Sequence, residues 1–276
     1  MAIGLKEKLR DEAFKQEFSF FGVPRLEELE KVPFPPNRGL SKPSEVMRGV
    51  KTVIVLGFHV WDIALNTVVA SAIPPDKIPF DIVEGAVYYN MYYEIVEARA
   101  WRICKFLWYL GYNAIPSQGI HLKAAATLAG LGFIGKMTLV LTPQYGSRQR
   151  WVGILTDAAL TPDEPWKFVH GGEGDLCKDC EICIDACPTA AIMPGYSQGV
   201  EPGKKVDTQR CIVPQELFDT PSQEANPHFK IVSPRGLFEC TVCHDSCPIG
   251  KENSMKKASE WRPTPRSNQN FPLTSD

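Results

Sequence analysis

Cysteine spacing is the feature that most limits what this chain can fold into. The segment "CKDCEICIDACP" has the spacing C-x2-C-x2-C-x3-C-P and contains Cys177, Cys180, Cys183 and Cys187. The segment "CTVCHDSCP" is one cysteine short of that pattern and contains Cys240, Cys243 and Cys247, while Cys211 stands alone between the two. A two-residue gap lets a tight turn direct successive thiolates toward one metal centre, so the spacing predicts metal ligation rather than disulfides.

Two [4Fe–4S] clusters account for these cysteines. When two clusters share one small domain, the fourth cysteine of a run ligates the other cluster. By that rule the first cluster is held by Cys177, Cys180, Cys183 and Cys247. The second is held by Cys187, Cys211, Cys240 and Cys243. The alternative is a pair of zinc sites, although zinc does not require two close cysteine runs that each end in Cys-Pro. The ninth cysteine, Cys104, lies in an apolar segment and is expected to be a buried small hydrophobic residue.

The chain divides into two compositional parts. Its 276 residues, 44% of them apolar, have room for one large domain or two unequal ones. Residues 1–165 carry helix and strand patterns. Residues 166–276 are rich in proline and glycine, carry eight of the cysteines and cannot build a large apolar core, so we expect metal to hold them together.

Hydrophobic periodicity predicts several elements in the first part. "KTVIVLGFHV" is typical of a buried strand, and residues 81–110 form a long helical pattern that ends at Gly111. "HLKAAATLAGL" is a second helical segment. "MTLVLT" and "RWVGILTD" flank a glycine turn, which predicts a hairpin between them.

Charge and hydropathy favour a soluble, cytoplasmic protein. A net charge of -2 gives no reason to expect a surface that follows nucleic-acid phosphates. The longest apolar stretch, near Thr52–Val60, is far shorter than the roughly 20 residues that cross a bilayer. The charged opening segment is not signal-like.

A glycine segment, "GLGFIGK" (Gly130–Lys136), matches G-x-G-x-x-G. The dinucleotide-binding interpretation requires a preceding strand, whereas this segment follows a helical pattern. The other interpretation is a closely packed turn.

The order of segments carries a resemblance to a known superfamily. "LWYLGYNAIPSQG" is followed by "AAATLAGLGFIGK", by "LVLTPQYGSRQRWVGILTD" and then by the two cysteine runs. This order, from about Val53 to Lys251, resembles the corrinoid-dependent reductases, which include reductive dehalogenases and tRNA epoxyqueuosine reductases. The resemblance implies an α+β protein: a nitroreductase-like α/β corrinoid-binding domain over residues 1–165, then a small bacterial-ferredoxin-like two-cluster domain over residues 166–276.

The resemblance also implies a second cofactor, base-off cobalamin without a lower protein ligand. In agreement, none of the five histidines lies in a D-x-H-x-x-G motif. The implied corrinoid contacts are Gly130, Leu131, Gly132, Gly135, Lys136, Tyr145, Gly146 and Ser147, with Thr156 and Asp157 nearby. Electrons would pass from a low-potential donor such as ferredoxin or flavodoxin through the clusters to the corrinoid, and a protein acid would supply the proton.

The proton donor implied by the dehalogenases is a tyrosine aided by a lysine or arginine. "VYYNMYYE" places Tyr88 and three further tyrosines on the predicted helix, and Lys123 follows. A desolvated tyrosine beside a cation can have a lowered pKa, so Tyr88 and Lys123 are the predicted catalytic residues. The alternative is that tyrosines with helical spacing pack a core or interface.

Three histidines are also assigned expected roles. His121 is a candidate polar contact or acid. His244 either tunes a cluster or faces solvent. His59 is expected to be a satisfied core histidine.

Two departures from the epoxyqueuosine reductases favour a small organic substrate over tRNA. Those enzymes carry an aspartate ahead of "AGLG", where this chain has Pro116 or Ser117. Their C-terminal tRNA-binding extension has no expected counterpart here. The sharpest expectation is a reductive dehalogenase-like enzyme. The alternatives are epoxyqueuosine reduction on tRNA and an electron-transfer or activator protein without catalysis of its own.

Overall fold

The computed structural model describes residues 4–33, 40–59, 83–169, 171–187, 190–193, 206, 231–232, 238–239 and 242–254. Residues 83–94, 231–232, 238–239, 242, 245 and 254 are described by their backbone alone.

A four-stranded antiparallel sheet organises the first part of the chain. It contains β1 (Phe20–Gly22), β2 (Thr52–His59), β3 (Ala114–Ser117) and β6 (Gln149–Thr156), in the order β1-β2-β6-β3. The two long strands β2 and β6 pair along their whole length, from Thr52 opposite Thr156 to His59 opposite Gln149. They read as nearly continuous apolar runs because both faces of the sheet are covered.

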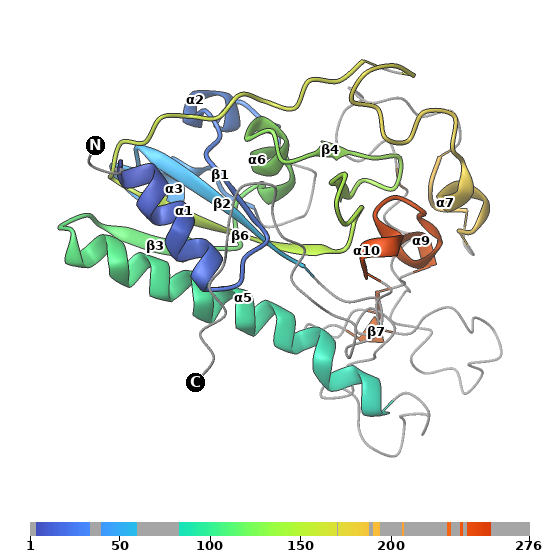
Figure 1. The fold of residues 1–276 in the computed structure, drawn as a ribbon, viewed down its shortest axis with the longest axis horizontal. Coiled ribbons are helices and arrows are strands. Elements are labelled where there is room, and N and C mark those ends of the chain that lie inside the picture. Colours follow the sequence, from blue (N-terminus) through green and yellow to red (C-terminus); the bar gives the residue numbers. More distant parts are fainter. Residues whose placement is uncertain are drawn as a thin grey trace.

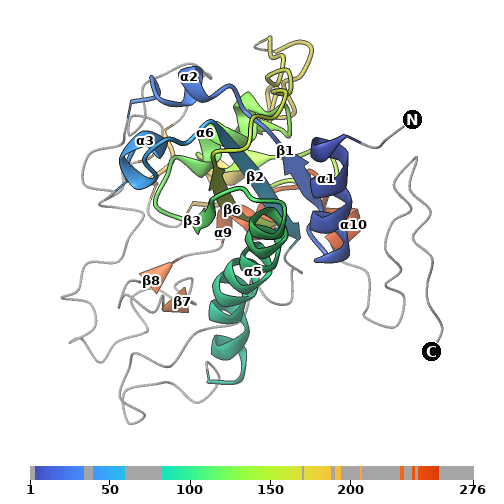
Figure 2. The ribbon, with the colours of Figure 1, turned by 90° about the vertical axis from the view of Figure 1, so that its left-hand side faces the viewer.

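Helices cover the sheet on both sides (Figures 1 and 2). On one side lie α1 (Leu5–Lys15) and α5 (Val83–Tyr109), and on the other α2 (Leu26–Leu29), α3 (Pro43–Val46) and α6 (Leu122–Leu128). Alternation along β2 divides the core, since Ile54 and Leu56 point to α5 whereas Val53 and Val55 point to α6.

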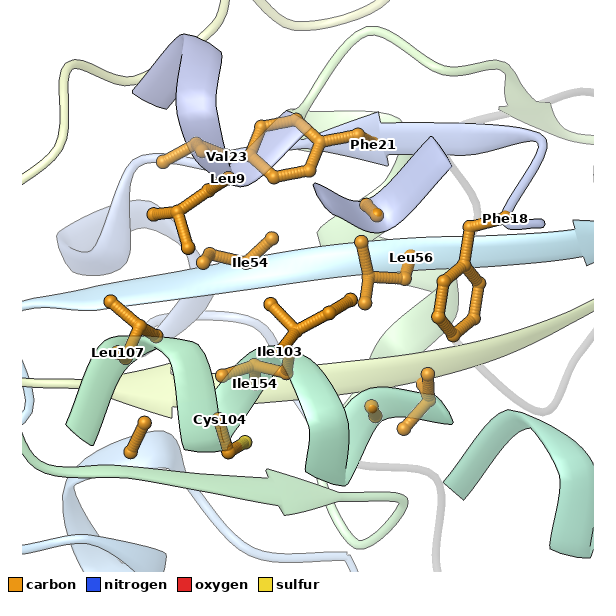
Figure 3. Close-up of a cluster of buried hydrophobic side chains, with 14 of the residues drawn as sticks. Leu9, Phe18, Phe21, Val23, Ile54, Leu56, Ile103, Cys104, Leu107 and Ile154 are labelled. Carbon is orange, nitrogen blue, oxygen red and sulfur yellow. The ribbon is translucent and has the colours of Figure 1, made fainter. Parts of the chain in front are cut away.

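The core beneath α5 follows from helical spacing. Val96, Ala100, Ile103, Cys104 and Leu107 form one buried stripe of the helix. Figure 3 shows Ile103 and Leu107 pointing toward β2, with side chains from the α1–β1 region closing the cluster. The predicted burial of Cys104 is confirmed, because its side chain is 0% exposed, and burial raises the pKa of its thiol to about 12.

The change Cys104→Ala is expected to lower stability without touching the metal centres. Removing one buried sulfur should cost about 1 kcal/mol, seen as a small shift of the urea midpoint. Iron content after cluster reconstitution should equal that of the wild type, because the thiol lies inside the core between α5 and the sheet. A loss of iron in this variant would contradict the assignment of Cys104 as a packing residue.

The long elements agree with the sequence-based expectations, but the predicted hairpin is wrong. β5 (Val140–Leu141) pairs with β4 (Phe133–Ile134), and β6 lies between β2 and β3. A tight turn, closed by the bridge between Thr142 and Gly146, directs the chain into the main sheet. The eight-residue ladder with β2 offers β6 many more backbone hydrogen bonds than the two-residue β5 could.

The described cysteine segments pack at the end of the sheet where β6 begins (Figure 1). They form α7 (Ile182–Asp185), α9 (Val242–Ser246) and α10 (Lys251–Ser254), and a short ribbon of β7 (Ile231–Val232) and β8 (Phe238–Glu239) lies between α7 and α9 in the chain. A third apolar cluster joins Cys183 and Cys247 to Phe133, Met137 and Leu141 of the β4–β5 region. The mixed α/β architecture is therefore confirmed, while the nitroreductase-like and ferredoxin-like descriptions and the division at residue 165 stay predictions.

Membrane insertion of a helix has no support in the described part of the chain. None of its helices combines the length and the apolar character needed to cross a bilayer.

Candidate functional site

The loop that carries the first cysteines is held by one buried carboxylate. Asp175 is 4% exposed, and its Oδ1 accepts the backbone N–H groups of Cys177 (3.0 Å) and Lys178 (2.9 Å). Its Oδ2 accepts the N–H of Gly171 at 2.9 Å. A turn then brings the N–H of Cys180 to the carbonyl of Cys177 at 2.8 Å. The loop is therefore ordered by the protein itself just before its first thiol.

Thiols from both cysteine runs lie near Cys183, which shares an apolar cluster with Cys247. Burial raises the pKa of Cys183 to about 12, with the neighbouring thiols of Cys177, Cys247 and Cys180 as further causes. Burial is likewise the main cause of the raised pKa of Cys177 and of Cys247. Cys247 thus lies beside the first run, although more than 60 residues separate them in the chain. This is the donor set predicted for the first cluster.

Ligation itself stays a prediction. The described His, Cys, Asp and Glu side chains form no group of three in metal-binding geometry, so the assignment depends on cysteine spacing and on the proximity of the thiols. Of the second predicted set, Cys187 accepts the N–H of Ala191 at 3.2 Å, and Cys243 borders the third apolar cluster. Cys211 and Cys240 lie outside the described residues.

The glycine segment lies against the first cysteine run. A Cβ at Gly135 would lie 2.5 Å from Leu141 Cδ1 and 3.3 Å from the sulfur of Cys177. Lys136 Nζ donates to the carbonyl of Cys180 at 2.9 Å, and its backbone N–H opposes the rise of the Cys177 pKa.

The other residues of this segment are closely packed too. Gly130 has a φ of +71° and follows α6, and a Cβ there would meet the carbonyl of Glu164 at 2.5 Å. A Cβ at Gly132 would meet the carbonyl of Leu141, and Leu131 packs against the core between α6 and the sheet. The space beside these glycines is thus occupied by the chain's own atoms. The part of these residues in corrinoid binding stays a prediction.

Three cations lie near enough to His244 to affect its pKa. Burial is the main cause that holds the pKa of His244 well below its usual value, and the charges of Arg150, Arg148 and Lys123 add to it. His244 is 8% exposed, and its Nδ1 shares a 3.1 Å hydrogen bond with Ser147 Oγ. We call Lys123, Arg148 and Arg150 the cation group. Because the imidazole of His244 is neutral, the positive charge of this site comes from the lysine and the two arginines. This charge suits an anionic partner.

An aromatic pair adjoins the cation group. Tyr145 stacks on His59 with ring centroids 4.0 Å apart, and Phe20 meets Tyr145 edge-on at 5.9 Å. Burial first, and the charge of Arg148 second, lower the pKa of His59 to about 4. His59 is therefore a buried neutral histidine, as expected from the sequence.

Acid should weaken the fold through His59. Its pKa is 6.5 in the unfolded chain and about 4 in the folded one, so the unfolded state binds more protons between these values. The free energy of unfolding should fall between pH 6.5 and pH 4, with up to about 3 kcal/mol from this residue. Urea midpoints from pH 7 to pH 4.5 would measure the slope. His59→Phe, which keeps a ring against Tyr145, should flatten it; an unchanged slope would refute the assignment.

Two predicted site residues lie at the far end of β6. Thr156 Oγ1 donates to the carbonyl of Asn113 at 2.7 Å, and Asp157 accepts the backbone N–H of Asn113 at 2.9 Å and its side-chain N–H at 2.7 Å. The length of β6 separates them from Ser147 by roughly 20 Å or more. The structure does not bring them to the cysteines or the cation group.

The predicted catalytic pair is described only in part. Tyr88 belongs to α5, where the structure describes its backbone but not its side chain. Lys123 lies in the first turn of α6 and belongs to the cation group. His121 caps the same helix, because its Nδ1 accepts the N–H of Ala124 at 3.2 Å. Burial, aided by Lys123, lowers the pKa of His121.

Sequence reasoning missed four polar residues of this region: Asp175, Arg148, Gln149 and Arg150. Signals for them exist. Asp175 precedes the first cysteine by two residues, a spacing suited to a side chain that binds nearby backbone N–H groups. Two arginines flanking a glutamine at the start of an apolar strand are unusual, because buried charges require partners or a function.

The comparisons with known proteins point to two groups of enzymes. The chain is 32% identical over 144 residues to epoxyqueuosine reductase from Bacillus subtilis. The aligned region covers 52% of this chain and 32% of that protein. It is 32% identical over 155 residues to tetrachloroethene reductive dehalogenase from Sulfurospirillum multivorans, covering 55% of the chain and 28% of that protein. The chain is homologous to both. This confirms the resemblance to the corrinoid-dependent reductase superfamily, and both groups of homologues are oxidoreductases.

The match covers about a third of each of these curated relatives. No family model matches the chain.

Solved structures of both groups share the fold. Epoxyqueuosine reductase from Streptococcus thermophilus superposes with a TM-score of 0.59 at 18% identity, covering 90% of this chain and 67% of that one. A catabolic reductive dehalogenase in complex with 3-bromo-4-hydroxybenzoic acid gives a TM-score of 0.59 at 18% identity, covering 90% and 32%. An epoxyqueuosine reductase with a tRNA stem loop gives 0.57 at 18% identity, covering 90% and 66%. The comparisons do not separate the two groups, so the preference for a dehalogenase over a tRNA enzyme gains no support from them.

Proposed function

We propose that this chain is a reductase that passes electrons from a low-potential donor through two [4Fe–4S] clusters to a corrinoid, which reduces a small organic substrate. One observation carries the proposal: Cys247 lies beside the thiols of the first cysteine run, at the same end of the sheet as the cation group. Electron-carrying and anion-attracting residues would then adjoin each other.

The residues present fit both cofactors. Four neighbouring thiols are the donor set of one cubane cluster. For a corrinoid, whose edge carries amide groups, Gln149 offers an acceptor. Its Nε2 donates to the carbonyls of Val140 (2.8 Å) and Gly146 (2.9 Å), which fixes the amide orientation. Its buried Oε1 then has no hydrogen-bond partner within the described part of the chain. Gln149, Lys123 and Arg150 would hold the corrinoid, which supplies electrons at low potential when bound.

A dehalogenase-like reaction makes use of the cations. Two electrons and one proton replace the halogen on carbon by hydrogen, and a halide ion leaves. Lys123 and Arg150 would stabilise the departing halide or an anionic group of the substrate. Tyr88 would supply the proton. The absence of a carboxylate at Pro116 or Ser117, both of which lie in β3, favours this reaction over epoxide reduction.

Epoxyqueuosine reduction is the second candidate, because relatives and structural neighbours include that enzyme and one neighbour carries a tRNA stem loop. The third candidate, an electron-transfer protein without catalysis, would need the clusters alone.

Anaerobic reconstitution with iron, sulfide and hydroxocobalamin tests the proposal. We expect about eight irons per chain in two [4Fe–4S] clusters and one equivalent of cobalt. Eight irons without cobalt would leave only the electron-transfer candidate. The loaded protein, given a chemical low-potential reductant, would then be offered 3-bromo-4-hydroxybenzoic acid and an epoxyqueuosine-containing tRNA stem loop. Bromide release supports the dehalogenase-like reaction, whereas conversion of the tRNA alone would replace it by the second candidate.

A further inference from the structure

One arginine joins the second cysteine run to the sheet. Arg148 has a side chain that is 0% exposed. One terminal guanidinium nitrogen donates to the carbonyls of His244 (2.9 Å) and Cys247 (3.0 Å), and the other donates to the carbonyl of Ile249 (3.1 Å). All three acceptors are nearly 100 residues away in the chain, so these bonds are tertiary contacts.

The acceptors lie at the end of α9 and just beyond it. The carbonyl of His244 also accepts the N–H of Cys247 at 3.3 Å, so Arg148 adds a second bond to it. α9 is five residues long, too short to be stable by itself. The last carbonyls of a helix lack partners within it and carry partial negative charge. A buried guanidinium with its fixed fork of donors satisfies several of them at once. Arg148 thus binds the last turn of α9 together with the carbonyls of Cys247 and Ile249 beyond it.

Neighbouring contacts act in the same direction. Ser147 bonds His244, and Asn253 Nδ2 of α10 donates to the carbonyl of Gln144 at 2.6 Å. Gly146 and Gly250 approach so closely that a Cβ on either would collide with backbone of the other's turn. Residues 144–148 therefore contact the second cysteine segment at His244, Cys247, Ile249, Gly250 and Asn253.

We propose that residues 144–148 form a latch on the second cysteine run, with Arg148 as the positioning residue that places Cys247 against Cys177, Cys180 and Cys183. This proposal depends on the proposed function only because it assumes that clusters are present. The contacts themselves involve only protein atoms, so they can be tested separately from the clusters.

Hydrogen–deuterium exchange on wild type and variants, purified and compared in the same metal state, tests the latch directly. In Arg148→Met the exchange of peptides covering residues 242–254 should accelerate about tenfold or more, the effect of losing hydrogen bonds to a charged donor. Peptides of β2 and of the central part of β6 should exchange as in the wild type. Arg148→Lys, which keeps the charge but not the fork, should lie between the two. The exposed Arg48→Met is the matched control and should change nothing.

Reconstitution provides the second measurement. The Arg148→Met protein should hold about four irons, with the EPR signal of the remaining cluster unchanged. Unchanged exchange at residues 242–254, or faster exchange throughout the chain, would overturn the proposal, because Arg148 would then be no latch or only a global stabiliser. Full iron content in Arg148→Met would also overturn it. If the wild type binds no iron, the proposed function fails while the exchange data still decide on the latch.

Discussion

Replacing Cys247 by serine is expected to leave about four of about eight irons after anaerobic reconstitution, because this residue is predicted to complete the first cluster. Its side chain shares an apolar cluster with Cys183, against which Cys177 also packs. A serine oxygen is a poor cluster ligand, so the first cubane should not form while the second does. Iron analysis together with EPR of the reduced protein would show one remaining cluster.

The complementary variant is Cys211→Ser, which should lose only the second cluster. Cys104→Ala serves as the control that keeps all iron. If Cys247→Ser lost both clusters or neither, the interlocked pairing of the two cysteine runs would be contradicted.

Replacing Lys123 by methionine is expected to lower kcat by about 10²-fold or more, with a smaller change in KM, for whichever substrate the loaded protein reduces. Lys123 is the member of the cation group that a helix presents to the site. Its charge would matter most when negative charge develops on the substrate, and methionine keeps the length of the side chain without that charge. Steady-state kinetics at saturating reductant would measure both constants.

Lys123→Arg should recover part of the rate because it restores the positive charge. The exposed Lys51→Met is the matched control and should behave as the wild type. A kcat within twofold of the wild type in Lys123→Met would remove Lys123 from the list of catalytic residues.

Much of the site region was open to prediction from local patterns. The cysteine spacing predicted that Cys247 returns to the first run, because the geometry of a cubane cluster is already contained in the gaps between cysteines. The strand at Thr52–His59, the helix at Val83–Tyr109 and the burial of Cys104 followed from periodicity, since each depends on residues close in sequence.

Other features depended on contacts that no local pattern contains. "MTLVLT" and "RWVGILTD" have every local sign of a hairpin, yet β6 pairs with β2 and β3 because a longer ladder and a two-sided core are available there. Likewise Gly130–Lys136 matches a nucleotide-binding pattern, whereas its glycines permit close packing against Glu164, Leu141 and Cys177.

The sequence by itself determined the main strands and helices and the superfamily, and it predicts the donor set of the clusters, because these depend on residue type and short spacing. Only the tertiary structure decided that Arg148 binds the carbonyls of His244, Cys247 and Ile249, and that Lys123 and Arg150 share one site with His244. Those contacts join segments from 27 to 121 residues apart. They exist because the packed sheet brings the start of β6, the first turn of α6 and the end of α9 to the same place.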